Sequence, residues 1–226
     1  MKYKALLLDI DNTLYDYDTT HTFAKKSVID FCKKEFNIDE MKITEAYDKA
    51  RKKVHIELSE TASSHNRLLY FQKMCELLEI NPLSNSFEIY NIYWDAFLEN
   101  MKQFDGIYEL LKKYKGKICL VTDLTAHIQY RKIKNLKLDK YCSQIVTSEE
   151  AGKEKPHPYM FMLALQKLNL QTNDVCMIGD SFKKDIFGAS NLNIKSIWLN
   201  SDEKKENYDN ALVQEVKTFK EILELV

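Results

Sequence analysis

The sequence predicts an α/β fold in which a parallel sheet is flanked by helices. Two observations carry this prediction. Short apolar runs alternate with segments of helical periodicity at the start of the chain and again from about residue 104. Between about residues 17 and 100 the pattern is helical throughout. Parallel strands joined by right-handed helical crossovers are the arrangement consistent with the alternating part.

The first strand is predicted at the N-terminus. The run Leu6-Leu7-Leu8 is short and branched-aliphatic, and it ends at Asp9, with Asp11 two residues later. Residues i and i+2 of an extended strand point to the same side, so both carboxylates can reach one spot beyond the strand. Two acids at one point repel each other unless a cation or a shared proton is present.

Four helices are expected in the inserted helical segment. Apolar residues recur there at helical spacing in four stretches, and Asn81-Pro82 breaks the chain before the last one. The residues that mark the four stretches are Phe23, Val28 and Ile29; Tyr47, Val54 and Leu58; Leu68, Phe71 and Cys75; and Tyr90, Tyr93 and Phe97.

The remaining elements alternate again up to the C-terminus. Each apolar run is short enough for a buried strand, and each intervening segment is long enough for a crossover helix. The expected elements are a helix near 106–115, a strand near 117–122, a helix near 125–136, a strand near 144–147, a helix near 158–169, a strand near 174–178, a helix near 183–191, a strand near 195–199, and a short edge strand with a closing helix between 212 and 226.

Polar residues stand at or near the ends of later strands. Thr122 and Asp123 end the apolar run that begins at Ile118, and the Thr122 hydroxyl can donate to a phosphate oxygen. Lys155 is followed by prolines at positions 156 and 158, which stiffen the chain and hold the lysine as a fixed point charge. These residues are candidates for binding an anionic substrate.

The apolar run from Val175 to Ile178 is followed by Gly179 and then by a further acid, Asp180; Asp185 comes five residues later. In open α/β sheets, ligands bind at the carboxyl ends of the strands. Carboxylates from Asp9, Asp11 and Asp180 would therefore meet there. Mg²⁺ suits this set, because it prefers one or two carboxylates together with waters and substrate phosphate.

Composition limits the classes of partner. The 226 residues carry 33 basic and 34 acidic side chains, so there is no basic field for a nucleic acid polymer. No apolar segment approaches the length of a membrane span. The five cysteines form no Cys-x-x-Cys pair, which is typical of reduced thiols in a cytoplasmic protein. We expect a cytoplasmic monomer or homodimer that acts on a small molecule.

In order and type, the motifs resemble those of the haloacid dehalogenase-like hydrolase superfamily, on its phosphatase branch. The resemblance spans residues 9 to 189, which is most of the chain. Motif I, Asp-x-Asp-x-Thr, is Asp9 to Thr13; motif II is Thr122; motif III is Lys155-Pro156; and motif IV runs from Gly179-Asp180 to Asp185. Two positions depart from the family pattern: Asp123-Leu124 stands where the family often has Asn-Gly, and Lys184 stands where it often has Asn.

The resemblance implies a Rossmann-like parallel sheet flanked by helices, with an inserted helical cap domain. The core would comprise residues 1–16 and 101–226, and the cap residues 17–100. It also implies a two-step phosphoryl transfer: Asp9 would attack phosphorus and form an aspartyl-phosphate, and Asp11 would protonate the leaving oxygen and later deprotonate the hydrolytic water.

The resemblance assigns further roles. Mg²⁺ would be held by Asp9, the backbone carbonyl of Asp11, and Asp180. Thr122, Asp123 and Lys155 would bind the phosphate, and Asp185 would support Lys155 or a metal-bound water. The hinge residues Tyr15, Tyr17 and His21 have two interpretations, as substrate contacts or as hinge packing.

The implied substrate is a small phosphorylated metabolite, with a nucleoside monophosphate as the first candidate and phosphoglycolate or a sugar phosphate as the alternative. A phosphomutase would share every core motif. A dehalogenase is disfavoured by Asp11, because halide needs no proton to leave. A non-catalytic binding module is disfavoured by the complete set of acid, base and lysine.

Overall fold

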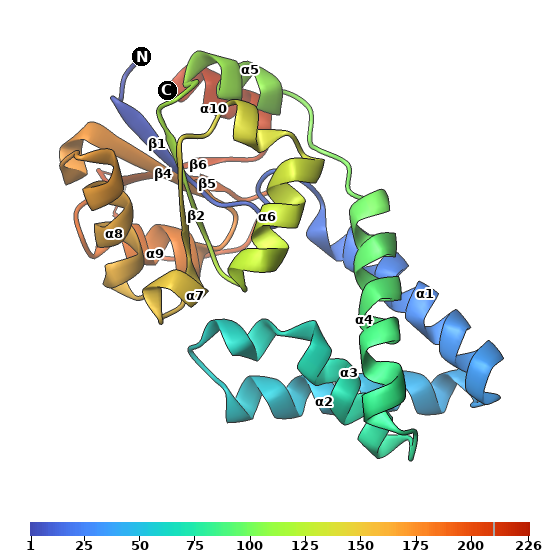
Figure 1. Cartoon of the computed structure of the whole chain (residues 1–226). Helices are drawn as coiled ribbons and strands as arrows, with labels where there is room; N and C mark the ends of the chain where they lie inside the picture. The colour runs from blue at the N-terminus through green and yellow to red at the C-terminus, as the bar shows by residue number, and fades with distance from the viewer. Residues whose placement is uncertain (210) are drawn as a thin grey trace. The chain divides into compact units, whose positions relative to one another are not determined.

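The computed structural model describes residues 1–209 and 211–226. The chain divides into two compact units (Figure 1). The larger unit comprises Met1–Asp16 and Lys102–Val226, and the smaller unit comprises Tyr17–Met101. Among the described residues, no helix combines the length and the apolar character needed to cross a bilayer.

The larger unit is built on a six-stranded parallel sheet with the order β3-β2-β1-β4-β5-β6. β1 lies between β2 and β4, so the carboxyl ends of these three strands are neighbours at one edge of the sheet. This confirms the predicted fold class and the predicted strand positions. The strands are β1 (Ala5–Leu8), β2 (Ile118–Thr122), β3 (Gln144–Thr147), β4 (Val175–Gly179), β5 (Lys195–Leu199) and β6 (Val213–Val216).

Helices cover both faces of the sheet. α8 (Pro158–Leu168) and α9 (Phe187–Ser190) pack on one face, where Phe161 joins a fully buried cluster with alternate strand residues. α5 (Ile107–Lys113), α6 (Ala126–Asn135) and α10 (Phe219–Leu225) lie on the opposite side (Figure 1). This division follows from right-handed crossovers. From β1 to β3 the chain crosses the sheet in one direction, and from β3 to β6 it crosses in the opposite direction, so the crossover helices of the two halves cover opposite faces.

The helix expected near 183–191 differs from the prediction at its start. The chain first makes one π-helical turn, Phe182–Ile186, and only then enters α9. Ser181 holds this turn, because its carbonyl accepts from Asp185 N at 2.8 Å and its side chain accepts from Lys184 N at 3.3 Å. The wider turn brings Asp185 back toward the end of β4, where its Oδ2 accepts from Ser181 N at 3.1 Å.

Short elements complete the connections between the main helices and strands. One helical turn, α7 (Ser148–Ala151), directly follows β3. The 3₁₀ segments are η1 (Ala62–His65), η2 (Leu138–Lys140) and η3 (Thr172–Asp174).

The smaller unit contains four helices in its described chain, as the sequence predicts: α1 (Tyr17–Phe36), α2 (Glu40–Glu57), α3 (Arg67–Leu77) and α4 (Pro82–Glu99). Three of them begin at a side chain that accepts a hydrogen bond from the first helical turn, which satisfies a backbone donor that would otherwise lack a partner. Aromatic rings fill the interior, with Tyr47, Tyr70, Phe71, Tyr93, Trp94 and Phe97 all buried.

Arg67 lies inside this aromatic interior and is 5% exposed. It donates to the His65 carbonyl at 2.7 Å and to the hydroxyl of Tyr17, and its guanidinium lies over the rings of Tyr70 and Tyr93. The ring of His21 stacks on Tyr17 at 5.8 Å between centroids. Within the smaller unit, these contacts favour the packing interpretation of the two hinge residues over the substrate-contact interpretation.

The partly buried His21 gives a pH-dependent term in stability. Burial, and next the positive charge of Arg67, lower the pKa of His21 from 6.5 to about 4. The unfolded chain therefore binds this proton at a higher pH than the folded chain. We expect the free energy of unfolding to fall as the pH drops from about 6.5 to about 4.

Urea unfolding of the wild type and of His21→Gln, at about pH 7.5 and about pH 5, measures this term. Glutamine retains a polar partner for Tyr93, whose hydroxyl lies 2.7 Å from His21 Nδ1. The wild type should lose more stability than the variant between the two pH values. Equal losses would show that His21 does not contribute.

Candidate active site

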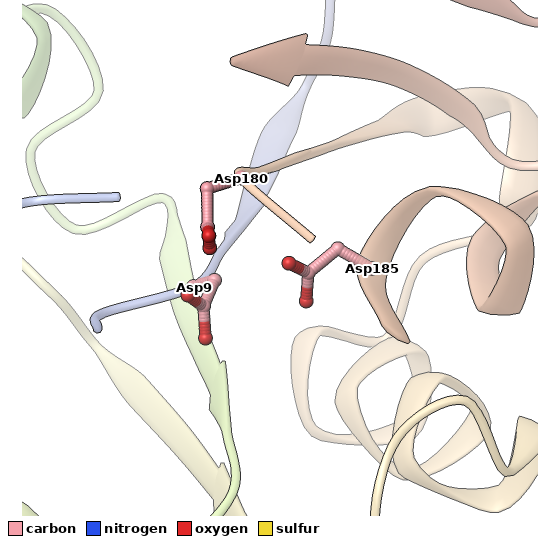
Figure 2. Close-up of side chains that lie close together, drawn as sticks. All are labelled: Asp9, Asp180 and Asp185. Atoms are coloured by element: carbon pink, nitrogen blue, oxygen red, sulfur yellow. The ribbon is translucent and has the colours of Figure 1, made fainter. Parts of the chain in front are cut away.

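Three carboxylates meet at the carboxyl ends of β1 and β4 (Figure 2). Asp9 directly follows β1, Asp180 directly follows β4, and Asp185 comes from the π-helical turn. One carboxylate oxygen from each residue lies within 4.8 Å of the others. The structure thus places acids from the beginning and the last third of the chain at one point.

The ammonium of Lys155 lies among these carboxylates and is buried. Its Nζ donates to Asp9 Oδ1 at 2.6 Å, to Asp185 Oδ1 at 2.7 Å and to the Val121 carbonyl at 2.9 Å. Burial alone would lower the pKa of Lys155, but Asp185 and Asp9 hold it well above its usual range. The lysine is therefore a permanent positive charge next to Asp9.

The site holds more negative than positive charge. Burial raises the pKa of Asp9 well above its usual range; the Lys155 ammonium opposes this rise, and the charges of Asp185 and Asp180 add to it. Burial, and then the Asp185 charge, raise the pKa of Asp180 to about 7. A divalent cation would relieve this repulsion, and carboxylate oxygens are the ligands that a hard cation such as Mg²⁺ prefers.

Thr13 connects the ends of β1 and β4. Its Oγ1 lies 3.1 Å from Asp9 Oδ2 and 3.3 Å from Asp180 Oδ1, and it accepts from Asp180 N at 3.1 Å. The side chain is fully buried. Thr13 therefore holds the two acids at a set separation.

Asp11 points to a different set of partners. Both of its oxygens accept from Lys132 Nζ, at 2.7 and 2.8 Å, and Oδ1 also accepts from the hydroxyl of the fully buried Tyr15. Burial raises the pKa of Asp11, but the charge and hydrogen bonds of Lys132 and the Tyr15 hydroxyl outweigh it, so the pKa lies below its usual value.

The sequence analysis did not identify Lys132. A signal for it exists in α6, whose buried positions are Ile128, Gln129, Lys132 and Ile133. A lysine within the buried stripe of an amphipathic helix needs an anionic partner, so its position on that face marks it as a candidate for an ion pair.

Thr122 lies at the end of β2, next to β1, and is buried. Its Oγ1 accepts from Gln129 Nε2 at 2.8 Å, and the same amide donates to the Asp123 carbonyl at 2.7 Å. Gln129 thereby orients the strand end, and the Thr122 hydroxyl itself donates to the Asp123 carbonyl at 3.3 Å.

The two departures from the family pattern contact each other. Asp123 Oδ2 accepts from Lys184 Nζ at 2.8 Å, and Asp123 Oδ1 accepts from Lys155 N at 2.9 Å. The additional negative charge is therefore matched by an additional positive one. Leu124, where the family often has glycine, has a φ of +97°, so the backbone keeps a conformation that favours glycine.

Gly179 permits the close approach of Asp185 to the strand end. A Cβ on this residue would lie 2.4 Å from Asp185 Oδ2 and 2.5 Å from its Cγ. We expect Gly179→Ala to displace Asp185, to lower the free energy of unfolding by about 1–3 kcal/mol and to reduce activity. Urea denaturation and steady-state kinetics measure the two effects.

The Asp185→Gly background provides the control, because it removes the whole side chain that the new methyl group meets, including the Cβ at 2.6 Å. There, Gly179→Ala should cost less stability than in the wild type. An equal cost in both backgrounds would show that the close approach to Asp185 is not the cause.

Comparisons with known proteins agree with these motifs. The sequence profile of the family described as haloacid dehalogenase-like hydrolase matches residues 6–199. The chain is 31% identical to the ribulose-1,5-bisphosphate 5-phosphatase of Halopiger xanaduensis, covering 92% of this chain and 89% of that protein. It is 25% identical to the glyceraldehyde 3-phosphate phosphatase of Pyrococcus furiosus, covering 98% and 93%. It is 24% identical to the pyrimidine 5′-nucleotidase YjjG of Escherichia coli, covering 100% and 99%.

Solved structures share the fold. The putative hydrolase YfnB of Bacillus subtilis, solved with magnesium, has a TM-score of 0.74 at 19% identity and is covered over 99% of its length. The 2-haloacid dehalogenase of Pseudomonas syringae has a TM-score of 0.75 at 19% identity, covered over 97%. Both cover at least 99% of this chain. With the profile match over residues 6–199, these findings show that the chain belongs to the haloacid dehalogenase-like hydrolase family.

Proposed function

We propose that the protein is a Mg²⁺-dependent phosphatase that hydrolyses a small phosphate monoester through an aspartyl-phosphate on Asp9. It is a phosphoric monoester hydrolase of its family. The observation that carries the proposal is the setting of Asp9, a buried carboxylate with a lysine ammonium at 2.6 Å and a second acid two residues later.

In this proposal, Asp9 is the nucleophile. A carboxylate that approaches a phosphate dianion is repelled, so positive charge must be present before the bond forms. Lys155 provides one such charge, because its Nζ is held by Asp9, Asp185 and the Val121 carbonyl. Its position is set before substrate arrives, which is where electrostatic stabilisation is most effective.

Asp11 is the general acid and base of the proposal. An alkoxide is a poor leaving group, so a proton donor beside it accelerates the first step, and the resulting carboxylate can then take a proton from the attacking water. Because Lys132 and Tyr15 hold the pKa of Asp11 below its usual value, Asp11 is a carboxylate in the free protein. In this proposal the proton that it donates arrives with the substrate, as a phosphate monoanion. A halide needs no proton to leave. Asp11 therefore supports phosphatase rather than dehalogenase chemistry, although the dehalogenase of Pseudomonas syringae shares the fold.

Asp9 and Asp180 would hold Mg²⁺, together with the backbone carbonyl of Asp11. When bound, the ion supplies positive charge that offsets the phosphate and orients its oxygens. Thr13 fixes the two acids for this role. Asp185 would support the site indirectly, because its carboxylate accepts a hydrogen bond from Lys155 and holds that ammonium in place. Thr122 and the backbone at Asp123 would bind the non-bridging phosphate oxygens.

The helical unit, Tyr17–Met101, is inserted between β1 and β2 and would act as a cap that sets specificity. The named relatives act on phosphorylated sugars of different sizes and on a pyrimidine nucleotide. We take a small phosphorylated carbohydrate as the first substrate class, and a nucleoside monophosphate as the second. A cytoplasmic location and a monomeric or dimeric state stay predictions from the sequence.

A panel of phosphorylated metabolites, assayed for phosphate release with Mg²⁺ or with EDTA, tests the proposal. The panel should include triose, pentose and nucleoside monophosphates, and Asp9→Asn serves as the blank. We expect release that needs Mg²⁺ and is absent from the blank. Activity that survives EDTA would remove the metal from the proposal.

Hydrolysis in ¹⁸O-labelled water separates a phosphatase from a phosphomutase. A phosphatase releases phosphate that carries oxygen from water, because water resolves the intermediate. A mutase moves the phosphoryl group to a second hydroxyl and releases none.

A further inference from the structure

We propose that Lys132 is a positioning residue that fixes the carboxylate of Asp11 for proton transfer. This inference rests on the proposed function, in which Asp11 is the acid and base. Lys132 itself touches neither the substrate nor the attacking water in this account. It acts through the side chain that it holds.

The contact geometry supports this role. The Lys132 ammonium lies 2.7 and 2.8 Å from the two oxygens of Asp11, so it restrains rotation of the carboxylate as well as its distance. The Tyr15 hydroxyl donates to Asp11 Oδ1. The Lys132 ammonium also lies 5.9 Å from the centroid of the Tyr15 ring, which packs the three groups together.

The burial of Lys132 argues against a purely structural explanation. Its side chain is 0% exposed, whereas that of Asp11 is 29% exposed. Burying a lysine ammonium is costly, and an ion pair seldom does better than apolar side chains of the same volume. The buried face of α6 carries Ile128 and Ile133 beside Gln129, so an apolar side chain could also stand at position 132. A methionine would serve packing alone.

Asp11 needs such a restraint because of where it lies. It is in the loop after β1, beside Asn12, whose φ is +60°. Lys132 comes from α6, and 121 residues separate the two in sequence. The ion pair therefore ties the loop to a helix of the same unit. A general acid must lie within about 2.6–3.2 Å of the atom that takes its proton, and an error of about 1 Å can cost about 100-fold in rate.

The first test uses leaving groups of different acidity. An alkyl phosphate needs a proton on its leaving oxygen, whereas p-nitrophenyl phosphate loses a stabilised phenolate and needs little help. We expect Lys132→Met to lower kcat/KM about 10- to 100-fold for the alkyl phosphate and only a few-fold for the aryl phosphate. A uniform loss on both substrates, or no loss on either, would overturn the inference.

The second test asks whether Lys132 acts through Asp11. In an Asp11→Asn background, adding Lys132→Met should change kcat/KM for the alkyl phosphate very little, because the group that it positions is already inactive. A full additional loss in the double variant would mean that Lys132 acts elsewhere. Lys134→Met is the matched control: this lysine is on the same helix, is 70% exposed and pairs with Asp139.

Folding must be separated from positioning. Circular dichroism and a thermal melt of each variant show whether it folds. If Lys132→Met does not fold, Tyr15→Phe keeps the buried ring and removes only the hydroxyl that donates to Asp11. Tyr15→Phe should also lose more kcat/KM on the alkyl phosphate than on the aryl phosphate, by a smaller factor than Lys132→Met. An equal loss on both substrates in Tyr15→Phe would also contradict the inference.

The outcomes distinguish this inference from the proposed function. A wild-type protein without Mg²⁺-dependent phosphate release would contradict the proposed function itself. An active wild type in which Asp11→Asn selectively loses the alkyl phosphate, while Lys132→Met does not, would contradict only the role of Lys132.

Discussion

We expect Asp9→Asn to eliminate phosphate release from every substrate, with a loss of more than about 1000-fold in kcat, because the nucleophile of the proposed reaction is gone. The fold should not suffer. Burial holds the pKa of Asp9 high against the opposing charge of Lys155, and the charges of Asp185 and Asp180 add to this effect, so without bound Mg²⁺ the ionised carboxylate destabilises the folded state. The variant should melt at the same temperature as the wild type or higher.

Steady-state kinetics with an aryl phosphate and a thermal melt test both parts of this expectation. The aryl phosphate is the stringent choice, because it depends least on the general acid. Full activity of Asp9→Asn would remove the nucleophile assignment. An inactive variant that is also unfolded would be uninformative about chemistry, and retention of the wild-type circular dichroism spectrum excludes that case.

We expect Lys155→Met to lower both activity and stability strongly. The substitution removes the charge that offsets the phosphate, which typically costs about 100- to 1000-fold in rate. It also leaves Asp9 and Asp185 buried without their shared cation. Removing one partner of a buried ion pair costs about 3–5 kcal/mol. Urea denaturation measures the stability term, and kcat/KM measures the catalytic one.

A double variant separates the two effects of Lys155. Adding Asp185→Asn to Lys155→Met removes one of the two buried carboxylates that have lost their cation. The double variant should therefore be more stable than Lys155→Met alone, but it should be no more active. Lys134→Met is the control, since this lysine pairs with Asp139 and is 70% exposed, and it should cost less than about 1 kcal/mol. Recovery of both properties in the double variant would contradict a catalytic role for Lys155.

Much of the site could be anticipated from local patterns. An apolar run that ends in a polar residue is a signal carried by a few consecutive residues, and Asp9, Thr122 and Asp180 each follow or end such a run. Parallel strands have their carboxyl ends at one edge of the sheet, so separate local signals predict one location. The ordered motifs supplied the roles, and the site geometry places the carboxylates of Asp9 and Asp180 together.

Other contacts had no local signal strong enough to predict them. The π-helical turn at Phe182–Ile186 was expected as ordinary helix, because apolar periodicity does not distinguish the two. The pair between Asp123 and Lys184 joins two departures from the family pattern that look independent in sequence. Each departure can be understood only when the other is known to lie beside it.

The sequence by itself determined the sheet and the order of the motifs, because hydrophobic periodicity and strand ends are local properties of the chain. The nucleophile candidate, Asp9, came from the resemblance of those ordered motifs to the family pattern. The family resemblance suggested that Asp185 supports Lys155, but only the tertiary structure decided that Lys155 also contacts Asp9 and that Lys132 pairs with Asp11. Lys155 reaches Asp9 and Asp185 across 146 and 30 residues, and Lys132 reaches Asp11 across 121. An ion pair depends on a separation of a few ångströms between side chains, and that separation is set by how helices and strands pack rather than by their order.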